Sequence, residues 1–177
     1  MLTKNIDFHI HSNVSDGSFS PTEIVRAALA RDLGAVALTD HDSVSGIDEF
    51  LAAAAGTGLT AVPGVEISSL LSGREIHILG FFLDPHHPEL LEFLARIRTG
   101  RNERNAEIIR RLHSLGYELT LEEVTAAAGG ESVGRLHMAT LLIQKGYFQD
   151  VKQAFERCLK RGAPAFCPRK LPHPEAA

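Results

Sequence analysis

The chain has 177 residues, 44% of them hydrophobic and 23% charged, which is typical of a globular protein with a sizeable core. Its longest nearly apolar stretch, residues 50–65, contains Gly56, Gly58 and Pro63 and is too interrupted to cross a membrane. The net charge of −4 conceals an acidic segment over residues 1–92, with 4 basic and 13 acidic residues, and a basic segment over residues 93–177.

The two cysteines do not indicate a disulfide framework, and the first residues lack a secretory signal. We therefore expect a cytoplasmic protein that does not associate with membranes. The excess of arginine in the second half could attract phosphate groups, although charge counting alone favours solvated helix faces.

The first half alternates segments with strand and helix patterns. Four segments are predicted to form strands: residues 6–11, 35–39, 60–65 and 75–82. Two helices are predicted between them: residues 20–32, which begin with an N-cap, a proline and a glutamate and end before Gly34, and residues 45–55, which end at Gly56. This order predicts parallel βαβ units and an α/β fold.

The pattern changes after residue 83, where helical spacing of apolar residues begins. A long helix is predicted over residues 89–115, with a break or bend near Gly100. Shorter helices are predicted over residues 121–128, 135–145 and 151–161. The chain is therefore divided into an α/β segment (1–83), a helical segment (84–170) and a short final segment (171–177).

Side chains that can bind metal recur at or after successive predicted strands. The candidates are His9, His11, Asp16, His41, Glu66 and His77, with Asp40 beside them. His9 and His11 lie two residues apart on a strand and therefore share one face. Because parallel strands end on one side of a sheet, these groups are expected to converge there. Imidazole and carboxylate ligands suit Mn, Zn or Fe, and a carboxylate shared by two cations suits phosphoryl chemistry.

Each candidate also has a purely structural interpretation. The pair His9 and His11 alone is a weak signal, Asp16 before a glycine is typical of a turn, and Asp40 and its neighbours could cap a helix. Glu66 could be a surface acid, and His77 could be a core histidine. The recurrence of such residues after four strands favours the metal site.

The residues that carry these side chains resemble the successive motifs of the PHP (polymerase and histidinol phosphatase) superfamily. The matching segments are Asp7-Phe8-His9-Ile10-His11-Ser12, Ser15-Asp16-Gly17, Leu38-Thr39-Asp40-His41-Asp42 and Gly64-Val65-Glu66. The resemblance implies a partial distorted (β/α)7 barrel with a helical insertion, and a centre for three divalent metal ions in the complete enzyme. It implies that His9, His11 and Glu66 hold one ion, that Glu66 bridges to a second ion held by His77, that Asp16 and His41 hold a third, and that Asp40 orients a ligand.

The second half resembles the helical insertion of small PHP phosphoesterases, a group that includes 3′,5′-nucleotide bisphosphate phosphatases and 5′-to-3′ exoribonucleases. The matching segments are Arg101–Asn105, Gly134–Ala139 and Gly162–Arg169. Arg135, His137 and Arg169 are the implied phosphate-binding residues, whereas Leu136 stands where the group usually has proline. Without the resemblance, Arg135 could equally be a solvent-facing helix residue.

These features predict a metal-dependent phosphoesterase acting on 3′,5′-bisphosphate nucleotides or RNA 5′ ends. The nucleophile is expected to be a metal-bound hydroxide, so no protein side chain is assigned as catalytic, and no protein partner is indicated. A phosphatase for a small metabolite such as histidinol phosphate, and a non-catalytic polymerase-associated metal-binding module, remain alternatives. The family's later metal ligands are missing and such barrels usually need about 250 residues, so we expect this chain to be an incomplete, inactive fragment.

Overall fold

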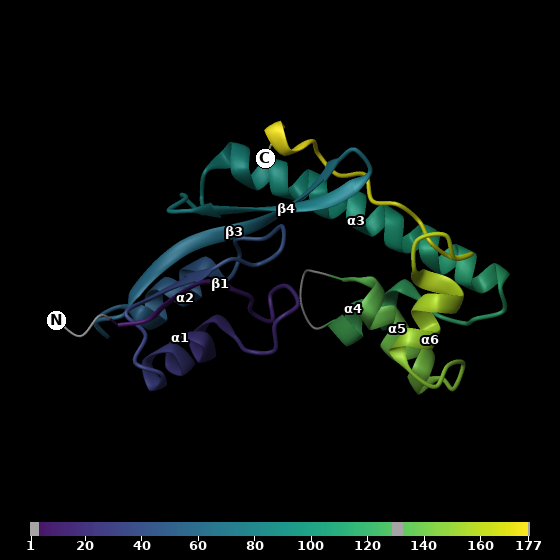
Figure 1. The fold of residues 1–177 in the computed structure, drawn as a ribbon, viewed down its shortest axis with the longest axis horizontal. Coiled ribbons are helices and arrows are strands. Elements are labelled where there is room, and N and C mark those ends of the chain that lie inside the picture. Colours follow the sequence, from purple (N-terminus) through teal and green to yellow (C-terminus); the bar gives the residue numbers. More distant parts are fainter. Residues whose placement is uncertain (1–3, 129–132, 177) are drawn as a thin grey trace. The chain divides into compact units, whose positions relative to one another are not determined.

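The computed structural model describes residues 4–128 and 133–176 (Figure 1). The chain forms two compact units, the first from Met1–Ile97 together with Leu171–Ala177, and the second from Arg98–Lys170. The boundary between the two units lies inside helix α3 (Pro88–Ser114). The change in sequence pattern at residue 84 comes shortly before the start of this helix. Within the described ranges, no helix has the length and apolar character needed to span a bilayer.

The first unit contains a four-stranded sheet in the order β1-β2-β3-β4 (Figure 1). Its strands are β1 (Ile6–Ile10), β2 (Ala35–Leu38), β3 (Thr60–Leu71) and β4 (Arg74–Phe81). The first three strands are parallel, as predicted, but β4 runs antiparallel to β3. The prediction of parallel pairing was wrong for β4 because only Ser72 and Gly73 separate the two strands, whereas a parallel crossover needs a dozen or so residues. Both turn residues have positive φ, 50° and 77°, as a two-residue hairpin turn requires.

Helix α1 (Pro21–Ala30) begins as predicted. The Glu23 N–H donates to Ser20 Oγ at 3.2 Å, and the Ser20 N–H donates to Glu23 Oε2 at 2.8 Å, which together form a capping box. The helix ends earlier than predicted, because Asp32 rather than Gly34 adopts the left-handed conformation, with φ 53°. Helix α2 (Ile47–Ala54) ends just before Gly56, whose φ is 74°.

The core of the first unit lies between the sheet and the helices. It contains side chains from α1, α2, three strands and the first turns of α3, among them Ile24, Val25, Val36, Leu38, Ile47, Phe50, Val65, Leu94 and Ile97. The final segment also belongs to this unit, since Pro172 O accepts a hydrogen bond from the Leu70 N–H at 2.9 Å. A short 3₁₀ helix follows at Pro174–Ala176.

The second unit is helical, as predicted. Helix α3 continues through Gly100 without the expected break and is followed by α4 (Leu121–Ala128), α5 (Arg135–Gln144) and α6 (Val151–Ala154). The helix predicted over residues 151–161 is instead an α-helical turn that passes into a π-helical turn, η1 (Phe155–Leu159). The unit has its own core, which includes Ile108, Leu112, Val124, Met138, Leu142, Phe148 and Leu159.

Candidate metal centre

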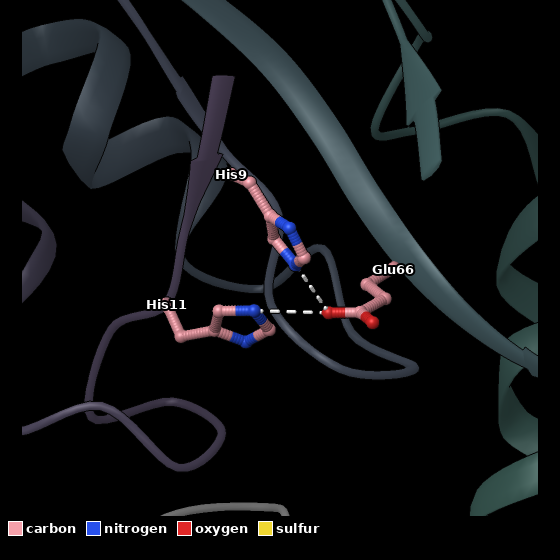
Figure 2. Close-up of side chains that lie close together, drawn as sticks. All are labelled: His9, His11 and Glu66. Atoms are coloured by element: carbon pink, nitrogen blue, oxygen red, sulfur yellow. Dashed lines mark hydrogen bonds and ion pairs between the residues drawn. The ribbon is translucent and has the colours of Figure 1, made fainter. Parts of the chain in front are cut away.

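Two histidines of the first strand point to one carboxylate oxygen (Figure 2). His9 lies in β1 and His11 directly follows its last residue, and both Nε2 atoms lie 2.9 Å from Glu66 Oε2. Glu66 comes from β3, and only 5% of its side chain is exposed, whereas the His9 side chain is 51% exposed. A buried carboxylate therefore lies against a histidine that solvent can reach.

The other oxygen of Glu66 faces the fourth strand. His77 Nδ1 lies 2.6 Å from Glu66 Oε1, although His77 stands in the middle of β4 rather than at the end of a parallel strand. It reaches the site because β3 continues beyond Glu66 and β4 folds back along it, pairing His77 with Ser68. His41 adds a fourth imidazole, with Nδ1 3.6 Å from Glu66 Oε2.

A second acid, Asp16, lies on the other side of His11 and His41. Asp16 Oδ1 is 3.2 Å from His11 Nδ1, and Asp16 Oδ2 is 3.7 Å from His41 Nε2. The loop that carries Asp16 needs Gly17, because a Cβ atom at that position would lie 2.1 Å from the carbonyl oxygen of His11. The loop thus turns tightly against the end of β1 and brings Asp16 back to the histidine.

The side chain of Asp40 stabilises the same loop through hydrogen bonds. Its carboxylate is buried and accepts hydrogen bonds from the Ser12 N–H at 2.7 Å, from Ser12 Oγ at 2.6 Å and from Ser15 Oγ at 2.6 Å. Asp40 therefore contacts the turn that precedes Asp16, and the orienting role predicted for Asp40 would act through that turn. The two serines could not be identified from the sequence, because serine is common in loops of every kind.

The structure brings all six predicted ligand residues together. Among the described residues, three groups have ligand atoms within 4.8 Å of one another: His9 with His11 and Glu66, His11 with Asp16 and His41, and His41 with Glu66 and His77. The grouping differs in one respect from the expected assignment, since His11 and His41 each take part in two groups.

The ionisation of these groups follows from their contacts. The hydrogen bond from His11 lowers the pKa of Asp16 to about 2, and the same contact raises the pKa of His11. Burial opposes the ionisation of Glu66, but hydrogen bonds from His9 and His77 and the nearby His41 outweigh it, so its pKa is lowered. Burial lowers the pKa of His41, which favours the neutral imidazole that binds metal.

The chemistry of the donor set fits divalent cations. Imidazole nitrogens and carboxylate oxygens lie together in three adjoining groups, and His41 Nδ1 is buried without a hydrogen-bond partner. An unpaired buried nitrogen is costly unless something coordinates it. A cation between His41, Glu66 and His77 would satisfy this atom.

The residues predicted to bind phosphate lie in the second unit. The guanidinium of Arg135 stands over the rings of Phe155 and Phe166, at 5.8 Å and 5.7 Å from their centroids, and donates to Leu159 O at 3.1 Å. His137 Nδ1 accepts the Gly134 N–H at 3.2 Å, which places the proton of the neutral ring on Nε2. Arg169 is half-buried.

Comparison with known proteins gives concordant results. The family model described as "PHP domain" matches residues 7–167. The chain is 41% identical over 165 residues to a 5′-3′ exoribonuclease of Haemophilus influenzae, and the matched residues cover 93% of this chain and 60% of that protein. It is 36% identical over 163 residues to a 3′,5′-nucleoside bisphosphate phosphatase of Chromobacterium violaceum, covering 92% of this chain and 57% of that protein.

A solved structure is also similar. The crystal structure of a proposed metal-dependent phosphoesterase from Bifidobacterium adolescentis matches with a TM-score of 0.83 at 29% identity, covering 96% of this chain and 60% of the other. The chain thus spans about 60% of the length of the relatives that it matches.

Proposed function

Because this chain belongs to the PHP domain family, we propose that it is part of a metal-dependent phosphoesterase that hydrolyses phosphate esters of nucleotides. The observation that carries the proposal is the set of histidines around the Glu66 carboxylate. Glu66 Oε2 lies 2.9 Å from Nε2 of His9 and of His11, and Glu66 Oε1 lies 2.6 Å from His77 Nδ1. The named activities of the relatives from Haemophilus influenzae and Chromobacterium violaceum support a nucleotide bisphosphate or an RNA 5′ end as the substrate.

We assign the roles of the side chains from their geometry. Glu66 would help to hold one cation together with His9 and His11, and a second together with His41 and His77. Asp16 would contribute its oxygens to a further cation beside His11 and His41. Divalent cations held there would supply Lewis-acid polarisation of the phosphoryl oxygens. The donor types suit Mn, Zn or Fe, and three ions are the expected number for the complete enzyme.

Phosphate recognition would fall to the second unit. A neutral His137 carries its proton on Nε2 and can donate it to an anion. Phe155, Phe166 and the carbonyl of Leu159 fix the plane of the Arg135 guanidinium. An oriented guanidinium is suited to two-point contact with a phosphate. Arg169 would provide a further positive charge, and a cytoplasmic location agrees with a nucleotide substrate.

The proposal is tested by metal binding and turnover of a version of the protein that is extended to the length of its relatives. Metal content after equilibration with Mn²⁺ is measured beside release of phosphate from adenosine 3′,5′-bisphosphate and release of nucleotides from a 5′-phosphorylated RNA. The matched control is Glu66→Gln, which keeps the shape of the side chain but removes its charge. Turnover that is lost together with the metal in Glu66→Gln supports the proposal.

Other results would point elsewhere. An unaltered protein that takes up no Mn²⁺ contradicts the metal centre. Metal uptake with turnover of histidinol phosphate but not of nucleotides would favour the small-metabolite phosphatase, and metal uptake without turnover of any of the three substrates would favour a binding module.

A further inference from the structure

The proposed function assigns no role to Asp42, whose side chain is fully buried. It follows His41 directly and adopts a left-handed backbone conformation, with φ 55°. Aspartate tolerates this conformation better than most residues because its side chain is short and polar. Burial of a charged group is costly unless strong hydrogen bonds compensate it, so its partners indicate what it does.

The partners of Asp42 lie on β3, next to Glu66. Its Oδ1 accepts the Ser68 N–H at 2.8 Å, and its Oδ2 accepts Ser68 Oγ at 3.0 Å. The backbone is engaged as well, since the Asp42 N–H donates to Glu66 O at 2.9 Å. One residue thus ties the loop after β2 to β3 by both its main chain and its side chain.

The position of Ser68 links this contact to three of the clustered side chains. Ser68 stands two residues after Glu66, on the same face of β3, and is the direct antiparallel partner of His77 on β4. On the other side of the contact, His41 immediately precedes Asp42 and forms a parallel bridge with Glu66. The contact between Asp42 and Ser68 therefore adjoins all three members of the group His41, Glu66 and His77.

The neighbouring group depends on this contact much less. His9 lies in β1 and His11 directly follows it, whereas the hydrogen bonds that join Asp42 to Ser68 and Glu66 end on β3. Loss of the carboxylate would free Ser68 to shift, and His77 would move with it, while His9 and His11 kept their support.

We infer that Asp42 is a positioning residue, which sets the spacing of His41, Glu66 and His77 through its two hydrogen bonds to Ser68. The inference rests on the proposed metal centre and adds to it a residue that controls one donor group more than the other. Residues that support metal ligands from behind typically change metal affinity by about 10- to 100-fold when they are replaced.

The experiment is a Zn²⁺ titration followed by the ring ¹⁵N shifts of His77 and His9, one reporter for each group. The variant is Asp42→Gly, because glycine keeps the positive φ without strain while the side chain and its two hydrogen bonds to Ser68 are removed. We expect the Zn²⁺ concentration at the midpoint for His77 to rise by about 10- to 100-fold, and that for His9 to change much less. Ile24→Ala, a core variant of α1, is the control for general loss of stability and should leave the ratio of the two midpoints unchanged.

A second variant keeps the test decisive if Asp42→Gly does not fold. Asp42→Asn retains one acceptor oxygen for the Ser68 N–H, so it should shift the His77 midpoint in the same direction by a smaller factor. Equal midpoints in the unaltered protein and in the folded variants would overturn the inference alone. If no histidine of the unaltered protein responds to Zn²⁺, the metal centre itself fails and the inference falls with it.

Discussion

Replacing Asp40 by alanine is expected to destabilise the first unit and release the loop that carries Asp16. The Asp40 side chain is buried and accepts three hydrogen bonds of 2.6–2.7 Å from Ser12 and Ser15. Hydrogen bonds to a charged group contribute roughly 1.5–3 kcal/mol each. Each buried donor left without a partner costs about 1–3 kcal/mol. Because the three bonds share one carboxylate, their contributions are not additive, and we expect the free energy of unfolding to fall by about 3–5 kcal/mol.

The chain offers a convenient way to locate this loss. It has no tryptophan, and its two tyrosines, Tyr117 and Tyr147, both lie in the second unit. Urea unfolding is followed by far-ultraviolet circular dichroism, which reports both units, and by tyrosine fluorescence, which reports the second unit. In Asp40→Ala the dichroism transition should move to lower urea by more than the fluorescence transition does.

An exposed aspartate of the same unit provides the control. Asp48 is 68% exposed and pairs with His86 at 3.1 Å, and such surface pairs contribute only about 0–1 kcal/mol. Asp48→Ala should therefore leave both transitions nearly in place, and Asp40→Asn, which keeps part of the acceptor capacity, should fall between the two. If Asp40→Ala were as mild as Asp48→Ala, the network around Asp40 would not hold the loop.

Three further predictions concern the metal and phosphate groups. Gly17→Ala should weaken Zn²⁺ binding in a chelator competition, because the new Cβ would lie 2.1 Å from His11 O and displace the loop; unchanged affinity would contradict this close approach. Metal affinity should fall as the pH decreases through the raised pKa of His11, since the Asp16 hydrogen bond stabilises a proton that the metal must displace. The number of protons released on metal binding, measured by calorimetry, should therefore be greater at about pH 6 than at about pH 8. Equal proton release at the two pH values would refute this prediction. In a complete enzyme, Arg135→Ala should reduce turnover of a bisphosphate by a factor equivalent to about 1.5–3 kcal/mol and that of a monophosphate less. Arg135→Lys is the control that keeps the charge, and equal losses on both substrates would mean that Arg135 is structural.

The parts of the fold that could be predicted from the sequence are those that depend on local pattern. The capping box of α1 and the first three strands follow from short-range spacing. The clustering of acids and histidines follows from their recurrence at or after successive predicted strands. The length of β3 did not, because Ser68 and Ser69 interrupt the apolar run. Both serines are nevertheless buried, and Ser68 is satisfied there by Asp42, a residue 26 positions earlier in the chain. Such a long-range contact leaves no periodic signal.

The same reason explains the helix that ends differently from its prediction. Residues 151–161 have a continuous helical pattern, but the segment Phe155–Leu159 is π-helical. The Leu159 carbonyl at its end is bonded by Arg135, which is 24 residues away in the chain. Local propensity predicts that a helix exists, whereas the hydrogen-bond partners of its last turn depend on tertiary packing.

The shared ligands make the donor groups one coupled centre. His11 presents Nε2 to Glu66 and Nδ1 to Asp16, and His41 presents Nδ1 to Glu66 and Nε2 to Asp16. A neutral imidazole has a single lone pair for metal binding, because its other nitrogen carries the proton. Each of these two histidines can therefore serve either the Glu66 side or the Asp16 side, and not both while it is neutral. If more than one cation binds, the first would therefore fix the tautomer of the histidine that holds it and limit which nitrogens are left for another cation.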